Sequence, residues 1–200
     1  MQIVHDLKNQ INGLKLYATF LRRRIEKNER PADEQETIGK LINGLDRTAE
    51  DLSTIVRYGQ PVELKKQAGV EVDKVLRAAC AGLKDGDSSL KWKDDADGIQ
   101  GNLDLFKLTD AFKWLCTGAL KLRQNGDGAG EVAISTSTGT DGDQAVIEWS
   151  GLRQLDHDPF RSFAGSDEIK LALAAKIIEA HGGSAKFIDK KFVVTIPLAG

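Results

Sequence analysis

The sequence has few of the features that stabilise small secreted proteins or anchor a chain in a membrane. It contains two cysteines in 200 residues, and Cys80 and Cys116 lack the CxxC spacing of metal and redox sites. We therefore predict that both are reduced thiols in the core of a cytoplasmic protein. No run of about 18 apolar residues occurs and no signal peptide precedes the first helix, so we expect no membrane contact.

The chain also lacks a strong charge of either sign. Its 28 Lys and Arg residues nearly balance 30 Asp and Glu residues, for a net charge of −2. A balance of this kind provides no basic field for nucleic acid, which we therefore exclude as a partner. The hydrophobic fraction of 40% is enough for one ordinary domain plus a smaller element.

The first 60 residues contain no strand signal and read as two helices. Apolar residues recur every three or four positions from Met1 to Lys27, and again from Ile38 to Val56 after a break at Pro31. Two such helices predict a hairpin, which by itself cannot bury an apolar stripe on each helix. We therefore predict that residues 1–60 form half of a dimeric four-helix bundle.

His5 lies on the polar side of the first helix. Helical spacing places it about 170° from the centre of the apolar arc, with Asn9 about 40° away on the same exposed side. A lone exposed histidine is usually only a solvated side chain. However, the same face continues with Asn12, Gly13, Leu16 and Phe20, and two large apolar side chains there indicate a docking surface.

Residues 61–200 mix helices and strands. The patterns predict strands at 62–66, 90–93, 131–137 and 144–149, a final hairpin of 184–188 with 191–197, and helices at 70–83, 104–122 and 168–180. Helices on one face of a mostly antiparallel sheet make a two-layer α/β sandwich, so the chain as a whole is of the α+β class.

Several segments together resemble the catalytic core of two-component sensor histidine kinases. His5-Asp6-Leu7-Lys8-Asn9 is similar to the H box of that family, and Asp158-Pro159-Phe160 resembles the start of its phenylalanine box. The segment from Leu171 to Gly183 is similar to the helix after the second glycine box, and Phe192 to Leu198 is similar to the last strand. The resemblance implies a dimerisation and histidine-phosphotransfer hairpin followed by a kinase-type ATP-binding domain.

The resemblance assigns roles to residues of the first helix. It implies that His5 accepts the phosphoryl group, that Asp6 orients the imidazole, and that Asn9 positions water when a partner response regulator is dephosphorylated. It further implies that the receiver domain of the regulator docks on one face of this helix, formed by Asn12, Gly13, Leu16 and Phe20.

Three nucleotide contacts of the family are missing from this chain. Trp114 and Gly118 stand where the N box supplies asparagines for magnesium and phosphate. The strand that ends at Trp149 runs straight into Ser150-Gly151-Leu152, without the aspartate that the first glycine box would place there to read adenine. Glu168-Ile169-Lys170 replaces the glycines of the second glycine box. We therefore predict that neither ATP nor magnesium binds productively, and that the sandwich is a degenerate ATP-binding domain.

Two functions of different classes fit these features best. The first is a histidine phosphotransfer protein, similar to the kinase-like members of that class, that exchanges a phosphoryl group between His5 and a receiver aspartate. The second is a non-catalytic pseudokinase that binds a regulator or kinase and controls it or its dephosphorylation. A divergent active sensor kinase is a third possibility. His157 and His181 are interpreted as a loop residue and a helix cap, so no metal site is expected.

Overall fold

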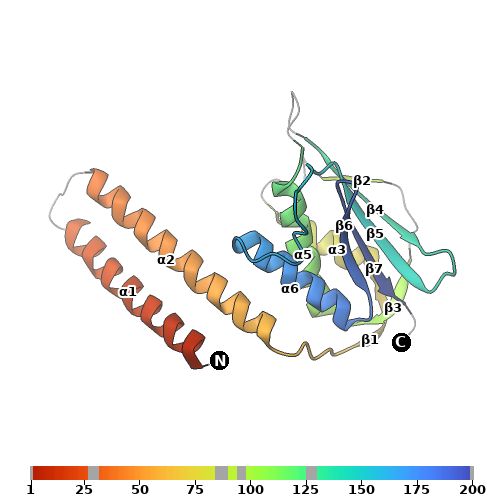
Figure 1. Ribbon diagram of the computed structural model, residues 1–200, viewed down its shortest axis with the longest axis horizontal. Coiled ribbons are helices and arrows are strands. Elements are labelled where there is room, and N and C mark those ends of the chain that lie inside the picture. Colours follow the sequence, from red (N-terminus) through yellow and green to blue (C-terminus); the bar gives the residue numbers. More distant parts are fainter. Residues whose placement is uncertain (1, 27–31, 84–89, 94–97, 125–129, 199–200) are drawn as a thin grey trace. The chain divides into compact units, whose positions relative to one another are not determined.

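The computed structural model describes residues 2–26, 32–83, 90–93, 98–124 and 130–198, with the backbone alone for residues 2–6, 8 and 32. The chain divides into two compact units, Met1–Gln60 and Pro61–Gly200. We call them the helical hairpin and the sandwich domain (Figure 1). No helix in the described ranges is long and apolar enough to cross a membrane.

The helical hairpin consists of α1, Gln2–Glu26, and α2, Ala32–Gly59, and confirms the helices predicted for this region. Ala18 and Ile42 are buried between the two helices, where the three-and-four spacing brings the stripes together. An ion pair of Lys15 with Asp46 joins the helices at the edge of this contact. The contact between the two helices therefore buries few side chains among the described residues.

The sandwich domain is built on a five-stranded sheet in the order β2-β4-β5-β7-β6. β2 runs parallel to β4, and all the other neighbours are antiparallel. The bounds of the strands are Leu90–Trp92 for β2, Val132–Thr138 for β4, Gln144–Ser150 for β5, Ser184–Ile188 for β6 and Lys191–Pro197 for β7. The final hairpin therefore has the bounds that alternation predicts.

Among the described residues, three helices cover one face of this sheet, as a two-layer sandwich requires (Figure 1). They are α3, Val72–Cys80, α5, Leu105–Lys121, and α6, Ser166–Ala180. The core lies between the layers, where Phe112 of α5 packs on Trp149 of β5 with 6.4 Å between ring centroids. Both side chains are fully buried. The predicted fold class is confirmed.

The start of the sandwich domain differs from the sequence prediction. The strand predicted at 62–66 is absent, and β1 lies at Gln67–Glu71 instead. It pairs antiparallel with β3, Gln100–Leu103, to form a separate two-stranded sheet. In the predicted strand, the backbone N–H of Lys65 donates to the Asp104 carboxylate at 2.7 Å, so a side chain takes the place of a strand partner.

The cysteines also differ from the prediction, because Cys80 of α3 and Cys116 of α5 form a disulfide and no described cysteine is free. Both are buried in the contact between these two helices, as predicted for core residues. The indole N–H of Trp149 donates to the sulfur of Cys116 at 3.4 Å. The pairing depends on helix packing between residues 36 positions apart, which the spacing of the cysteines does not reveal.

Candidate functional site

The predicted phosphotransfer residues begin in the first turns of α1. The backbone of His5 and Asp6 is helical, and their side chains lie outside the described part of the chain. Asn9 is one turn further along and is exposed, as is Asn12. Helical spacing puts Asn9 on the same side of the helix as residue 5.

The expected docking face continues down α1 with two large apolar side chains. Leu16 is 56% exposed and Phe20 is 57% exposed. Gly13, which follows Asn12, is half-buried. These residues recur at intervals of three and four, so they lie on one side of the helix. We call the surface of Asn9, Asn12, Gly13, Leu16 and Phe20 the polar-apolar face.

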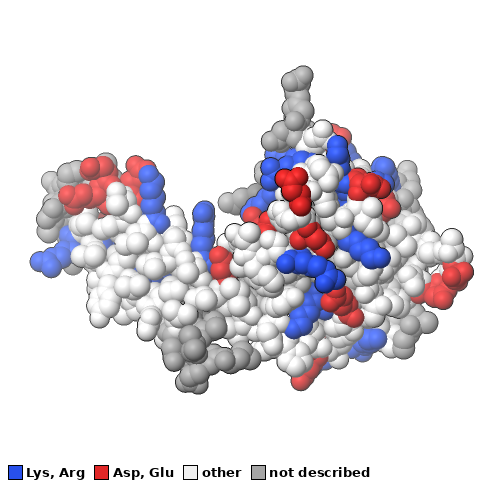
Figure 2. All heavy atoms as spheres, viewed as in Figure 1, with Lys and Arg blue, Asp and Glu red and all other residues white. Residues whose placement is uncertain are grey.

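A second exposed apolar surface lies on a different side of α1. It consists of side chains that are 43–69% exposed in the single chain, namely Leu7, Leu14, Tyr17 and Leu21. Their spacing puts these four side chains in the apolar arc of α1, but α2 does not cover them. In the view of Figure 2 the hairpin is mostly uncharged along its length, and charged side chains gather near the turn between the helices. The hairpin therefore presents two apolar surfaces.

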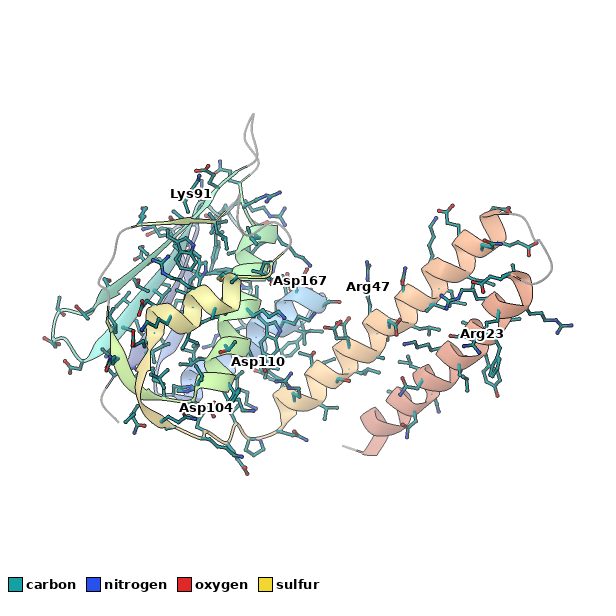
Figure 3. The ribbon with its side chains drawn as sticks, turned by 180° about the vertical axis from the view of Figure 1, so that it is seen from behind. Arg23, Arg47, Lys91, Asp104, Asp110 and Asp167 are labelled. Atoms are coloured by element: carbon teal, nitrogen blue, oxygen red, sulfur yellow. A yellow bond between two sulfur atoms is a disulfide. The ribbon has the colours of Figure 1, made fainter. Side chains whose placement is uncertain are left out.

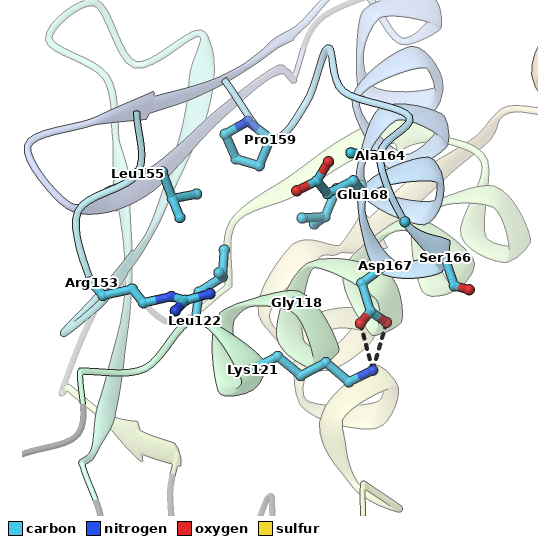
Figure 4. Close-up of a pocket in the computed structure, with 12 residues that line it drawn as sticks. Gly118, Lys121, Leu122, Arg153, Leu155, Pro159, Ala164, Ser166, Asp167 and Glu168 are labelled. Carbon is cyan, nitrogen blue, oxygen red and sulfur yellow. Dashed lines mark hydrogen bonds and ion pairs between the residues drawn. The ribbon is translucent and has the colours of Figure 1, made fainter. Parts of the chain in front are cut away.

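The sandwich domain contains a pocket of about 230 Å³ between the end of α5 and the start of α6. We call it the α5–α6 pocket (Figure 4). The resemblance to histidine kinases would place a nucleotide here, because its N box and second glycine box correspond to these two helix ends. Arg153, Leu155 and Pro159 line the opposite side, on the loop that follows β5.

An ion pair spans the mouth of the α5–α6 pocket. The ammonium group of Lys121, at the end of α5, lies 2.6 and 2.7 Å from the two carboxylate oxygens of Asp167 (Figure 4). Asp167 stands in the first turn of α6, where a negative charge is favoured by the helix dipole. The Lys121 ammonium group is therefore paired with a carboxylate of the chain itself.

The next residue of α6 binds the loop on the other side. One carboxylate oxygen of Glu168 accepts a hydrogen bond from the Ser162 hydroxyl, and the other lies 2.9 Å from His157 Nε2. The Ser162 hydrogen bond lowers the pKa of the Glu168 carboxyl from its usual value; partial burial opposes this and the His157 contact reinforces it. The sequence identified Glu168 as a replacement for glycine but gave no sign of its partners.

The two helices are in direct contact at the N box position. A Cβ atom on Gly118 would lie 2.8 Å from Leu171 Cδ2 and 3.1 Å from two further carbons of the same side chain. Leu171 is 1% exposed. A larger side chain at residue 118 would therefore collide with α6.

The segment after β5 is joined to the end of α5 by backbone hydrogen bonds. The N–H of Gln124 donates to the carbonyl of Gly151 at 2.9 Å, and the N–H of Arg153 donates to the carbonyl of Leu122 at 2.8 Å. Between these bonds the Leu152 side chain is buried, with 1% exposure. An apolar side chain therefore follows the strand where the resemblance would place the start of an adenine-reading loop.

His181 belongs to a buried cluster at the far end of α6. Its Nδ1–H donates to the Ile177 carbonyl at 2.8 Å, and its Nε2 accepts from the backbone N–H of Asp104 at 3.1 Å. Burial lowers the pKa of the imidazole, which this pattern requires to be neutral. The predicted C-cap position is confirmed, but the link to Asp104 at the start of α5 was not predicted (Figure 3).

Asp104 connects this cluster to the segment before β1. Its carboxylate caps α5 by accepting a hydrogen bond from the N–H of Lys107 at 2.9 Å, and it also accepts one from the N–H of Lys65 in that segment. Burial acts to raise the pKa of Asp104, but the N–H groups of Lys107 and Lys65, with smaller contributions from His181 and the Phe106 N–H, lower it overall. An aspartate directly before an apolar helix was the signal for this cap in the sequence.

Among the described residues, no group of three or more His, Cys, Asp or Glu side chains is arranged to hold a metal ion. His157 faces Glu168, as an exposed loop residue that forms an ion pair when protonated. His157 and Ser162 contact opposite oxygens of Glu168. A hydrolase triad would need the histidine to contact the serine, so the three side chains do not have that arrangement.

The fold is shared with solved histidine kinases. Full-length ShkA in complex with AMPPNP matches with a TM-score of 0.71 and 17% identity, over 99% of this chain and 45% of ShkA. The present chain thus spans less than half of that protein. Acinetobacter baumannii histidine kinase AdeS matches with a TM-score of 0.62 and 17% identity, over 92% of this chain and 95% of AdeS. Histidine kinase ThkA, solved with the response regulator protein TrrA, matches with a TM-score of 0.67 and 15% identity, over 98% of this chain and 61% of ThkA.

No protein-family profile matches the chain, and no curated protein sequence matches it. At 15–17% identity the likeness is one of fold. It extends over both units, since the matches to ShkA and ThkA cover nearly the whole chain.

Proposed function

Because the chain has the fold of a histidine-kinase catalytic core, we propose that it transfers a phosphoryl group between His5 and an aspartate of a response-regulator receiver domain without using ATP. The fold is consistent with a role in two-component signalling.

The observation that carries the proposal is the polar-apolar face of α1. Leu16 and Phe20 are each more than half exposed on the same side of the helix as Asn9, one turn after His5. A partner that buries this apolar pair would be positioned next to the imidazole. A receiver domain is the partner expected, and the solved complex of ThkA contains a response regulator protein.

The proposed reaction needs no cofactor. A lone pair of the neutral His5 imidazole attacks the phosphorus of the receiver acyl phosphate, so a P–N bond forms and the P–O bond to the aspartate breaks. The receiver aspartate leaves as a carboxylate, which keeps both bonding electrons. Asp6 is proposed to accept a hydrogen bond from the other ring nitrogen and stabilise the positive charge that develops there. The reverse reaction passes the group to a second receiver.

The α5–α6 pocket supports the ATP-independent form of this reaction. Asp167 and Glu168 place two carboxylates in the first turn of α6, where polyphosphate oxygens would need to approach. Lys121 is paired with Asp167, and Leu171 fills the space against Gly118. Carboxylates at this helix start repel a polyphosphate, and the Lys121 charge that could offset the repulsion is already paired with Asp167.

The second apolar surface of the hairpin supports a two-fold dimer. Leu7, Leu14 and Leu21 are spaced by seven residues and are all exposed in the single chain. On α2, Leu41 and Ile55 are exposed two heptads apart. Stripes with this period pair as a four-helix bundle, so we propose that two hairpins bury them against each other.

The proposal is tested by offering the full chain a phosphoryl group from two sources. One reaction contains a receiver domain carrying ³²P on its aspartate, and the other contains Mg²⁺ and γ-³²P-labelled ATP. We expect acid-labile label on the wild type from the receiver only. His5→Gln is expected to acquire none from either source, because glutamine has no nucleophilic ring nitrogen.

Each alternative has its own outcome. Label from ATP that disappears in His5→Gln would establish an active kinase and overturn the ATP-independent reaction. No label from either source, together with receiver binding in calorimetry, would favour the pseudokinase, which is the second candidate. Label from the receiver that persists in His5→Gln would show that another residue is the acceptor.

A further inference from the structure

The loop between β5 and α6 is held in place by the chain's own contacts. At its centre Phe160 is 4% exposed and packs on Phe192 of β7, with 4.9 Å between ring centroids. The backbone N–H of Phe160 donates to the side chain of Asp158 at 3.0 Å, and the N–H of Arg161 donates to the Asp158 carbonyl at 3.2 Å. The middle of the loop is therefore anchored on the sheet.

The remainder of the loop converges on one carboxylate of α6. Ser162, after Phe160, donates its hydroxyl to Glu168, and His157, before Phe160, lies 2.9 Å from the other oxygen. The N–H of Ala164 also contributes to lowering the pKa of Glu168, and it donates to the Ser162 oxygen at 3.3 Å. Groups on both sides of the apolar anchor are thus fastened to a single side chain.

This arrangement lies at the pocket where the resemblance would place a nucleotide. The loop lines the α5–α6 pocket through Leu155, Pro159 and Ala164, and Glu168 lies inside the same pocket (Figure 4). A loop beside a phosphate site is ordinarily ordered by contacts to the ligand. Here the Ser162 hydroxyl and the His157 ring are already in contact with the two carboxylate oxygens of Glu168.

We propose that Glu168, with Ser162 and His157, is an internal clamp that fixes the β5–α6 loop in one conformation and takes the place of nucleotide phosphate oxygens. The clamp deepens the proposed function, on which it rests in one respect: the domain has no nucleotide to order the loop. It makes the sandwich domain a preorganised body whose shape does not depend on a ligand.

Hydrogen–deuterium exchange of the full chain, without nucleotide or receiver, tests the clamp. In Glu168→Ala the amides of residues 160–164 should exchange about tenfold faster than in the wild type, because the loop loses its charged acceptor. Ser162→Ala removes one of the donors and should give a smaller acceleration in the same segment.

Asp167→Ala is the matched control. It removes a carboxylate from the same helical turn, and so perturbs the helix dipole to a similar degree, but its partner Lys121 lies on α5. Exchange in residues 160–164 should therefore stay at the wild-type rate. Equal rates in Glu168→Ala and the wild type, or an equal acceleration in Asp167→Ala, would overturn the clamp.

Two internal readouts separate other causes. The amides of residues 172–178 in α6 report whether a variant still folds, and if Glu168→Ala does not, Ser162→Ala decides the question because it leaves α6 intact. Adding Mg²⁺ and ATP to the wild type should leave the loop rates unchanged. Slower exchange on that addition would refute the ATP-independent function, whereas the comparison of Glu168→Ala with Asp167→Ala would still judge the clamp.

Discussion

Leu171 of α6 packs so closely on Gly118 of α5 that a Cβ atom at residue 118 would lie 2.8 Å from Leu171 Cδ2. The absence of a side chain at residue 118 is therefore a packing requirement, at a position where the resemblance to histidine kinases implies an asparagine. Gly118 lies inside a helix, where glycine costs about 1 kcal/mol relative to alanine, and the close helix contact offsets that cost. An asparagine at residue 118 would disturb this contact.

Gly118→Asn tests this relationship. We expect it to lower the free energy of unfolding by about 1–3 kcal/mol, as overpacking of a core does, and to confer no nucleotide binding. Urea denaturation measures the first effect, and titration with a fluorescent ATP analogue measures the second. Thr117→Asn, at the neighbouring half-buried position, should change stability by less than about 1 kcal/mol.

A double-mutant cycle identifies the cause of the loss. Leu171→Ala alone should cost about 2–5 kcal/mol because it opens a cavity, but combined with Gly118→Asn it removes the collision. The double variant should therefore lose less free energy of unfolding than the sum of the two single losses. If the two losses simply add, or if Gly118→Asn binds nucleotide, then Leu171 does not fill the space beside residue 118 as described.

The elements with a strong local period were predictable from the sequence. The predictions of both hairpin helices and of the β6–β7 pair were correct, because apolar spacing identifies these elements without information from elsewhere in the chain. β3 was missed, since Gln100-Gly101-Asn102-Leu103 has low strand propensity and depends on pairing with β1. The strand predicted at 62–66 was wrong because the Asp104 carboxylate binds the Lys65 N–H.

The candidate sites divide in the same way. The face of α1 followed from helical spacing alone, and Asn9, Leu16 and Phe20 are exposed as that spacing predicts. The contacts in the α5–α6 pocket could not be predicted in this way, because Lys121 and Asp167 are 46 residues apart in the sequence. The resemblance implied that Glu168 stands in place of a glycine, but only the fold brings Ser162 to it.

The two apolar surfaces of α1 make a reciprocal prediction. Leu14 and Leu16 are both 56% exposed, and two residues of helix place them on different sides. Leu14→Glu should dissociate the proposed dimer and leave receiver binding by each hairpin largely intact. Leu16→Glu should keep the dimer and weaken receiver binding by about tenfold or more, because it places a charge in a docking surface.

Sedimentation equilibrium measures the first property of these variants and calorimetry with the receiver domain measures the second. Because the exposures and the substitutions are matched, differences in solubility cannot account for opposite effects. If both variants dissociated the dimer, or both lost the receiver in the same proportion, a single surface would have to serve both partners.

Asn9 is proposed to position water for dephosphorylation of the receiver. Asn9→Ala should slow the dephosphorylation of a phosphorylated receiver by about 10²-fold, the scale expected for a lost positioning group in proton transfer. Transfer of label to His5 should change little, since the imidazole attacks phosphorus without water. Gln10→Ala removes a neighbouring exposed amide from another side of the helix and should affect neither rate.

A time course with a ³²P-labelled receiver separates the two rates, because label on His5 and released phosphate are counted independently. Equal loss of both in Asn9→Ala would assign the residue to docking. Unchanged phosphate release would remove Asn9 from the reaction altogether.

His181 should make the sandwich domain less stable as the pH falls. Its buried imidazole has a lowered pKa in the folded chain, so below about pH 6.5 the unfolded chain binds more protons. The contribution is present in full above that pH and is lost as the pH falls towards the folded pKa. Asp104 and Lys66 are the charged groups that act on the ring. Urea unfolding at pH 7.5, 6.5 and 5.5 should show a declining free energy of unfolding.

One histidine variant locates the source of that decline. His181→Asn should lower stability at pH 7.5 by about 1–3 kcal/mol, because the Asp104 N–H loses its acceptor, and should flatten the dependence between pH 7.5 and 5.5. A slope that survives in His181→Asn would place the titrating group elsewhere. A wild-type free energy that does not change over this range would mean that the imidazole is protonated to the same extent in the folded and unfolded chains, against the hydrogen bonds that require it to be neutral.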